Sequence, residues 1–185
     1  MNTSPTLKPR RRQSGTTAVE FALVAVVFFT LLFGVFELAR IMYMWSTLAE
    51  VVGRAARMAA MENPRNEAQV RSDAMFRNAA GRLPLGGGID PSYLRIDYLA
   101  ANRQTRVTPP ACPEQNIINC TNDPLGASCI RFVRVRLCKP GTDCTPVSFV
   151  PAVGLDALAN LNIELPTFAT VAPVEALGMP AACTP

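Results

Sequence analysis

Residues 15–45, GTTAVEFALVAVVFFTLLFGVFELARIMYMW, are the stretch from which the rest of the chain can be understood. Its central part, residues 21–36, has no charged side chain and lies between Glu20 and Glu37. As an α-helix with a rise of about 1.5 Å per residue, residues 18–45 would extend about 40 Å, which is enough to cross a bilayer. The stretch therefore predicts one membrane-spanning helix.

A buried apolar helix of a soluble protein is the alternative interpretation. However, the apolar residues surround the whole helix instead of forming one stripe, and phenylalanine is frequent among them. Tyr43 and Trp45 follow where membrane proteins carry a belt of aromatic side chains. These features favour the membrane span.

The net positive charge of the chain lies before the apolar stretch. The formal net charge is +4, and residues 1–15 contain four basic side chains and no acidic one, namely Lys8, Arg10, Arg11 and Arg12. Basic residues beside a span favour the cytoplasmic side, so we expect the N-terminus in the cytoplasm and the rest of the chain outside it. Because this charge lies in a short tail and not on a folded surface, no nucleic-acid partner is expected.

The cysteines agree with this orientation. All six follow the apolar stretch, at Cys112, Cys120, Cys129, Cys138, Cys144 and Cys183. An even number of cysteines on the oxidising side of a membrane predicts up to three disulfides, for which fifteen pairings exist. Sequence spacing favours the pairs Cys138–Cys144 and Cys112–Cys120, which would leave Cys129 to pair with Cys183. A zinc site is a poor alternative, because the chain has no histidine and no Cys-x-x-Cys pair.

Gly15 and Glu20 form the most specific pattern in the sequence. A basic leader precedes Gly15, and Phe21 and the apolar run follow Glu20. This arrangement resembles the processing site of type IV prepilins and pseudopilins, and residues 12–60 resemble the TadE and TadF proteins of the tight-adherence (Tad, or Flp) pilus system. The resemblance implies cleavage between Gly15 and Thr16 by a prepilin peptidase.

Physical chemistry gives each residue of this pattern a use. Gly15 has no side chain, so a protease can hold the backbone there in an extended conformation. After cleavage, Thr16 would carry an ammonium group about 6 Å along the helix axis from Glu20. A carboxylate near lipid is costly unless a cation pairs with it. The resemblance implies that Glu20 aligns subunits during assembly; the alternative is that Glu20 only complements the positive end of the helix dipole.

The rest of the chain predicts an α+β, pilin-like head. The helix should continue as a stalk to residue 61, because residues 37–61 are good helix formers without proline. Alternating apolar and charged side chains predict strands at residues 94–98 and 130–138. The other expected elements are a second helix at 64–83, a cysteine-bearing loop at 100–128, and short strands at 147–150 and 161–171. The expected domains are a cytoplasmic leader at 1–15, a transmembrane and stalk helix at 16–62, and an extracytoplasmic head with a small disulfide-bonded antiparallel sheet at 63–185.

The sequence offers little chemistry for catalysis. It has no histidine, no phosphate-binding glycine loop and no carboxylate cluster with metal-ligand spacing, so we expect no enzyme, cofactor, metal ion or small-molecule substrate. The resemblance implies a minor pseudopilin-like protein of the bacterial inner membrane, with other pilins or pseudopilins and the Tad assembly platform as partners. It leaves open whether the protein enters the surface pilus. The alternative is an uncleaved, signal-anchored envelope protein whose outer domain binds a ligand or partner.

Overall fold

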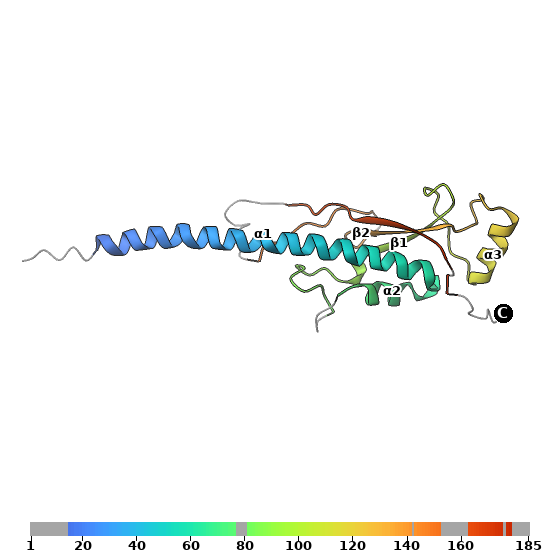
Figure 1. The fold of residues 1–185 in the computed structure, drawn as a ribbon, viewed down its shortest axis with the longest axis horizontal. Helices are drawn as coiled ribbons and strands as arrows, with labels where there is room; N and C mark the ends of the chain where they lie inside the picture. The colour runs from blue at the N-terminus through green and yellow to red at the C-terminus, as the bar shows by residue number, and fades with distance from the viewer. Residues whose placement is uncertain (1–14, 77–80, 142, 153–162, 176, 179–185) are drawn as a thin grey trace, which may run out of the picture. The chain divides into compact units, whose positions relative to one another are not determined.

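The computed structural model of the chain has one long helix, two shorter α-helices and a small sheet (Figure 1). It describes residues 15–76, 81–141, 143–152, 163–175 and 177–178. The chain divides into two compact units, Met1–Ala39 and Arg40–Pro185, and we call the second unit the head. The long helix α1, Thr16–Met61, contributes to both units. The predicted continuation of the apolar helix to residue 61 is therefore confirmed.

The sequence explains where α1 ends. The residue before a proline is disfavoured in helical geometry, and Pro64 has no N–H group to continue the hydrogen-bond ladder. Asn63 accordingly leaves the helix with φ −63° and ψ 131°. Its side chain accepts a hydrogen bond of 3.0 Å from the backbone N of Arg65 and so caps the 3₁₀ helix η1, Pro64–Asn66.

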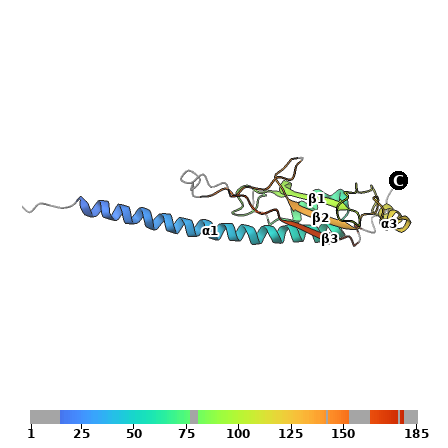
Figure 2. The ribbon, with the colours of Figure 1, turned by 90° about the horizontal axis from the view of Figure 1, so that it is seen from above.

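The head contains one antiparallel sheet of three strands in the order β1–β2–β3 (Figure 2). The strands are β1 (Leu94–Leu99), β2 (Phe132–Leu137) and β3 (Ala169–Pro173). The register pairs Ile96 with Val135 across β1 and β2, and Val135 with Thr170 across β2 and β3. The two strands predicted from alternating side chains are confirmed, and so is the α+β fold class.

The hydrophobic core lies between this sheet and the part of α1 that follows Arg40. Both views show that part of α1 alongside the sheet (Figures 1 and 2). Residues of a helix that lie three or four apart share a face, and residues of a strand that lie two apart do the same. The buried side chains are Met44, Leu48, Val51, Val52, Ala55 and Ala59 on α1, and Leu94, Ile96, Tyr98, Val133, Val135 and Leu137 on the sheet.

The second predicted helix is shorter than expected. Helix α2 spans Glu67–Ala74, whereas the sequence predicted a helix over residues 64–83. Met75 has extended backbone angles, φ −86° and ψ 132°, and its side chain is buried in the core. Core packing therefore overrides helix propensity at this point. Residues 77–80 of the predicted helix lie outside the described residues.

The sequence did not predict helix α3, Pro113–Asn122, which lies within the expected loop. Proline suits the first turn of a helix, where backbone N–H groups have no helical partner. The side chain of Asn116 is buried, its Oδ1 accepts a hydrogen bond from Ile130 N at 2.8 Å, and its Nδ2 donates one to Ile130 O at 3.2 Å. These two bonds attach α3 to the chain just before β2.

The two C-terminal strand predictions are only partly confirmed. In residues 147–150 the structure has a single bridge, between Ser148 and Glu164, and not a strand. Strand β3 begins at Ala169, within the predicted range of 161–171 but later than its predicted start, and residues 161–162 lie outside the described residues. Pro166 cannot donate to a strand ladder, so pairing with β2 begins beyond it. β3 lies at an edge of the sheet.

We expect Leu48→Ala to lower the free energy of unfolding of the head by about 2–5 kcal/mol, because it leaves a cavity under the sheet. Leu48 is 0% exposed. Met42→Ala on the same helix is the control, since Met42 is 64% exposed and its truncation should cost less than about 0.5 kcal/mol. Urea unfolding of the detergent-solubilised protein, followed by circular dichroism, measures both changes. Equal stability of the two variants would contradict this assignment of the core.

Candidate processing and assembly site

The first turn of α1 contains the predicted processing residues. Gly15 directly precedes the helix, Thr16 begins it, and the backbone N of Val19 donates a hydrogen bond of 3.4 Å to Gly15 O. A Cβ atom built on Gly15 would meet no described atom within 4 Å. The packing of the described chain therefore does not require glycine here. A requirement for glycine would have to come from a molecule that acts on the chain.

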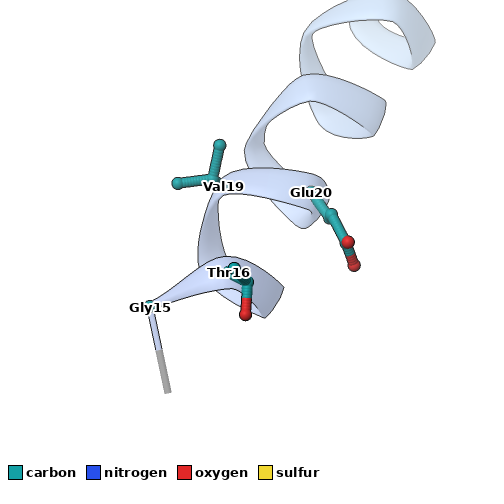
Figure 3. A pocket seen from close by; sticks show the side chains of 4 residues that line it. All are labelled: Gly15, Thr16, Val19 and Glu20. Carbon is teal, nitrogen blue, oxygen red and sulfur yellow. The ribbon is translucent and has the colours of Figure 1, made fainter. Parts of the chain in front are cut away.

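Thr16 and Glu20 lie on one face of this turn. Figure 3 shows both beside Gly15 and Val19, and the four residues line an open hollow of about 540 Å³. Residues four apart in a helix are neighbours on its surface, so the Glu20 carboxylate lies one turn from the backbone N of Thr16. The side chain of Glu20 is exposed. The structure thus brings together the predicted site residues, while their roles in processing and assembly stay predictions.

Phe21 begins an apolar surface that the described chain leaves uncovered. The most apolar window of α1 has a mean hydropathy of 2.5, and none of its residues is buried. The hydroxyl of Thr30 donates a hydrogen bond of 2.7 Å to Val26 O, so this polar group is satisfied within the helix. Such a surface is unfavourable in water and favourable in a hydrocarbon layer. Helix α1 is therefore compatible with a single-pass membrane anchor.

Arg40, the first residue of the head, is buried and was not singled out from the sequence. Its Nε donates a hydrogen bond of 2.8 Å to Leu85 O, and its Nη1 donates another of 2.8 Å to Val150 O. The guanidinium group also lies 4.8 Å from the ring centre of Phe149. Gly87 in the loop beside Arg40 has a φ of +62°, a backbone conformation that favours glycine. Arg40 therefore connects α1 to two loops of the head.

The disulfide between Cys138 and Cys144 confirms one of the predicted pairs. The Cα atoms of the two residues are 4.8 Å apart, and their bond closes the turn that follows β2. A short spacing in sequence was enough to identify this pair, because the turn needs no other element to bring its ends together.

The predicted bond between Cys112 and Cys120 is wrong. Cys112 caps the start of α3 and Cys120 lies near its end, so eight residues of helix separate them by about 12 Å along the axis, beyond the reach of a disulfide. Cys120 is bonded to Cys129 instead, with Cα atoms 4.6 Å apart. The predicted bond between Cys129 and Cys183 is therefore also wrong, and Cys183 lies outside the described residues. The error came from treating residues 100–128 as a loop.

A cluster of four arginines around Asp97 was also missed. The Asp97 side chain is 6% exposed, and its oxygens lie 3.7 Å from Arg95 Nε, 3.4 Å from Arg106 Nε, 3.3 Å from Arg134 Nη2 and 2.8 Å from Arg136 Nη2. The alternation of side chains correctly predicted that Arg134 and Arg136 lie on the face opposite the core. Only the strand register, which places Asp97 opposite Arg134 and Arg95 opposite Arg136, reveals the cluster.

The described part of the chain has few groups suited to catalysis. It contains no group of three or more acidic residues or cysteines placed to hold a metal ion. Burial, with a smaller contribution from the Glu67 carboxylate, raises the pKa of Tyr98 well above its usual value of 10.0, so its hydroxyl stays protonated at neutral pH. The expectation of a protein without enzymatic activity, cofactor or metal stays a prediction.

Comparison with known proteins finds a family similarity along most of α1. Residues 15–57 match the family model for TadE-like proteins. The match contains the candidate processing residues, the apolar surface and the first part of α1 that packs into the head. It confirms the resemblance to TadE seen in the sequence over these residues. Neither a curated protein nor a solved structure matches the chain.

We expect peptide mapping without reduction to find Cys120 linked to Cys129 and Cys138 linked to Cys144. The double variant Cys120→Ser/Cys129→Ser should lose about 2–3 kcal/mol of stability, because the open loop gains conformational entropy in the unfolded state. Urea unfolding followed by circular dichroism measures this loss. A peptide that links Cys112 to Cys120 would contradict the observed pairing.

Proposed function

Because residues 15–57 are similar to TadE-like proteins, we propose that this chain is a minor pseudopilin-like protein required to assemble a tight-adherence type IV pilus. A prepilin peptidase cuts it between Gly15 and Thr16, and α1 keeps the mature protein in the inner membrane. Other pilins or pseudopilins and the Tad assembly platform are its partners. The head then lies on the extracytoplasmic side.

The observation that carries this proposal is the position of Gly15. The family match begins at the residue that immediately precedes both α1 and the uncovered apolar surface. Cleavage after Gly15 would remove the basic leader and leave the entire helix in the mature protein. A signal peptidase acting beyond the apolar stretch would instead have to cut within α1, which is a continuous helix as far as Met61. The retained helix supports a pseudopilin over a secreted protein.

The disulfides support the proposed orientation of the head. Cys120 and Cys129 form one bond, Cys138 and Cys144 form another, and no described cysteine is free. Such bonds persist in oxidising compartments and are rare in the cytosol. The basic leader independently favours a cytoplasmic N-terminus.

Glu20 has a distinct role in the proposal. Its side chain is exposed one turn after the new N-terminus, on a helix whose next four turns are apolar. A carboxylate at the lipid boundary is costly unless it meets a cation. The new ammonium group of Thr16 provides this cation, in the same subunit or in a neighbour. When the pair forms between subunits, it fixes the position of one helix along the axis of the next.

We expect Gly15→Ala to be processed more slowly and Gly15→Leu not to be processed, because a side chain would obstruct the extended backbone in the protease. The fold should not change, since a Cβ at Gly15 meets no described atom. Gly34→Leu is the matched control, because a Cβ at Gly34 also meets nothing within 4 Å and the residue lies in the same helix.

Mass spectrometry of the protein extracted from membranes of cells that contain the peptidase measures the outcome. Wild type and Gly34→Leu should begin at Thr16, whereas Gly15→Leu should retain its leader. A wild-type protein with an intact leader would favour the uncleaved, signal-anchored alternative. Normal maturation of Gly15→Leu would exclude the peptidase from the proposal.

We expect Glu20→Leu and Glu20→Gln to insert into the membrane and to be processed, because both lower the cost of burial in lipid. Both should abolish pilus assembly if charge pairing sets the subunit position. Glu50→Gln is the control, since Glu50 is an exposed glutamate of the same helix within the head. Counting surface pili by electron microscopy measures assembly. If both Glu20 variants form as many pili as wild type, Glu20 has no role in assembly and only complements the positive end of the helix dipole.

A further inference from the structure

The outer face of the sheet carries much more positive than negative charge. Its arginine face consists of Arg95, Arg106, Arg134 and Arg136, which surround the single carboxylate of Asp97 at 2.8–3.7 Å. The five side chains together carry a formal net charge of +3. Arg95 and Arg136 also lie directly opposite each other on neighbouring strands, an arrangement of like charges that destabilises a sheet.

The hydrogen bonding of this face is incomplete as well. The Nε atoms of Arg134 and Arg136 are buried and have no hydrogen-bond partner among the described residues. Leaving a buried donor unsatisfied costs free energy, and a charged donor costs more than a neutral one. The buried Nε atoms themselves are out of reach of a ligand, but an additional carboxylate at this face would reduce the repulsion between the guanidinium groups.

A cavity adjoins the arginine face and has the same charge. It has a volume of about 230 Å³, and its charged lining residues are Arg71, Arg95 and Lys139. Arg71 forms an ion pair with Glu67, so the positive charge of the cavity comes from Arg95 and Lys139. No acidic side chain is among the described residues that line it. Arg95 belongs both to this cavity and to the arginine face, so the positive surface continues from the middle of the sheet to the start of β1.

We infer that the arginine face and this cavity dock an extended acidic segment of a partner protein. Guanidinium forks match carboxylates in shape and charge, and Asp97 already shows how this face holds one. Side chains two residues apart in a strand lie about 7 Å apart on one face, which is the spacing between Arg134 and Arg136. An extended partner segment presents alternate side chains at the same spacing, so carboxylates at every second position fit this face.

The burial of the arginines favours a peptide over a flat anionic layer. The side chains of Arg134 and Arg136 are both 23% exposed, so individual carboxylates must enter between neighbouring side chains to reach them. A layer of lipid headgroups could reach mainly Arg106, which is 53% exposed. This inference concerns only the head and does not depend on cleavage at Gly15.

Binding of fluorescent peptides to the full-length protein in a neutral detergent tests the inference. Fluorescence anisotropy is measured with a peptide in which Glu and Thr alternate, with a peptide of the same composition whose glutamates are contiguous, and with an alternating Lys–Thr peptide. We expect the alternating acidic peptide to bind several-fold more tightly than the contiguous one, more weakly as salt is added, and the basic peptide not to bind.

The double variant Arg134→Gln/Arg136→Gln should weaken binding by at least about tenfold. Its matched control is Arg57→Gln/Arg65→Gln, which removes the same charge at two exposed positions of the head and should leave the affinity unchanged. Circular dichroism verifies that each variant is folded. If the first variant fails to fold, Arg106→Gln provides the test, because its exposed side chain can be removed without disturbing the core, and it should weaken binding several-fold.

Four results would overturn the inference. These are no binding of the alternating peptide, equal binding of the two acidic peptides, unchanged affinity in a folded arginine variant, and tighter binding of another class of anion. Competition with polygalacturonate and with glycerol phosphate measures the last of these. Unlabelled alternating acidic peptide is the reference competitor. If polygalacturonate or glycerol phosphate displaces the fluorescent peptide at a lower concentration of anionic groups than this reference, the face would be assigned to a polysaccharide or a lipid headgroup.

Discussion

The contact between the apolar side of α1 and the inner face of the sheet is the interaction on which the head depends. Three strands with one apolar face need another layer to cover that face, and α1 supplies it through side chains such as Leu48 and Val52. The same helix is compatible with a membrane anchor in its earlier part. The apolar residues surround the earlier part of this continuous helix, whereas within the head they lie on one side of it.

The two faces of the sheet contribute differently to the stability of the head. The inner face contributes Ile96, Val133 and Val135 to the core, where their burial stabilises the fold. The outer face gathers arginines whose mutual repulsion and unsatisfied Nε atoms act against stability. Residues that disfavour the isolated fold are commonly retained for contact with another molecule. The inferred docking role would explain the charge imbalance around Asp97 in this way.

Much of the fold could be predicted from local sequence patterns. Alternating side chains identified β1 and β2, and the long run of helix formers identified α1 to Met61. The errors lie where tertiary contacts decide the backbone. Asn116 stabilises α3 through two hydrogen bonds to Ile130, fourteen residues away in sequence, and Met75 ends α2 where it enters the core. The disulfide errors followed directly from the missed helix.

The functional residues likewise differ in whether local sequence is enough to identify them. The Gly15 pattern is contiguous in sequence and could be recognised there, whereas the arginine face exists only once two strands pair in a particular register.

The core also depends on residues far apart in sequence, because it joins side chains near residue 50 with Ala172 in β3. Contacts between residues so far apart in sequence raise the contact order of the head, so its core and its sheet are complete only after β3 has joined them. If the head is delivered across a membrane, it crosses as an open chain, and envelope chaperones and disulfide-forming enzymes encounter its cysteines before the sheet is complete.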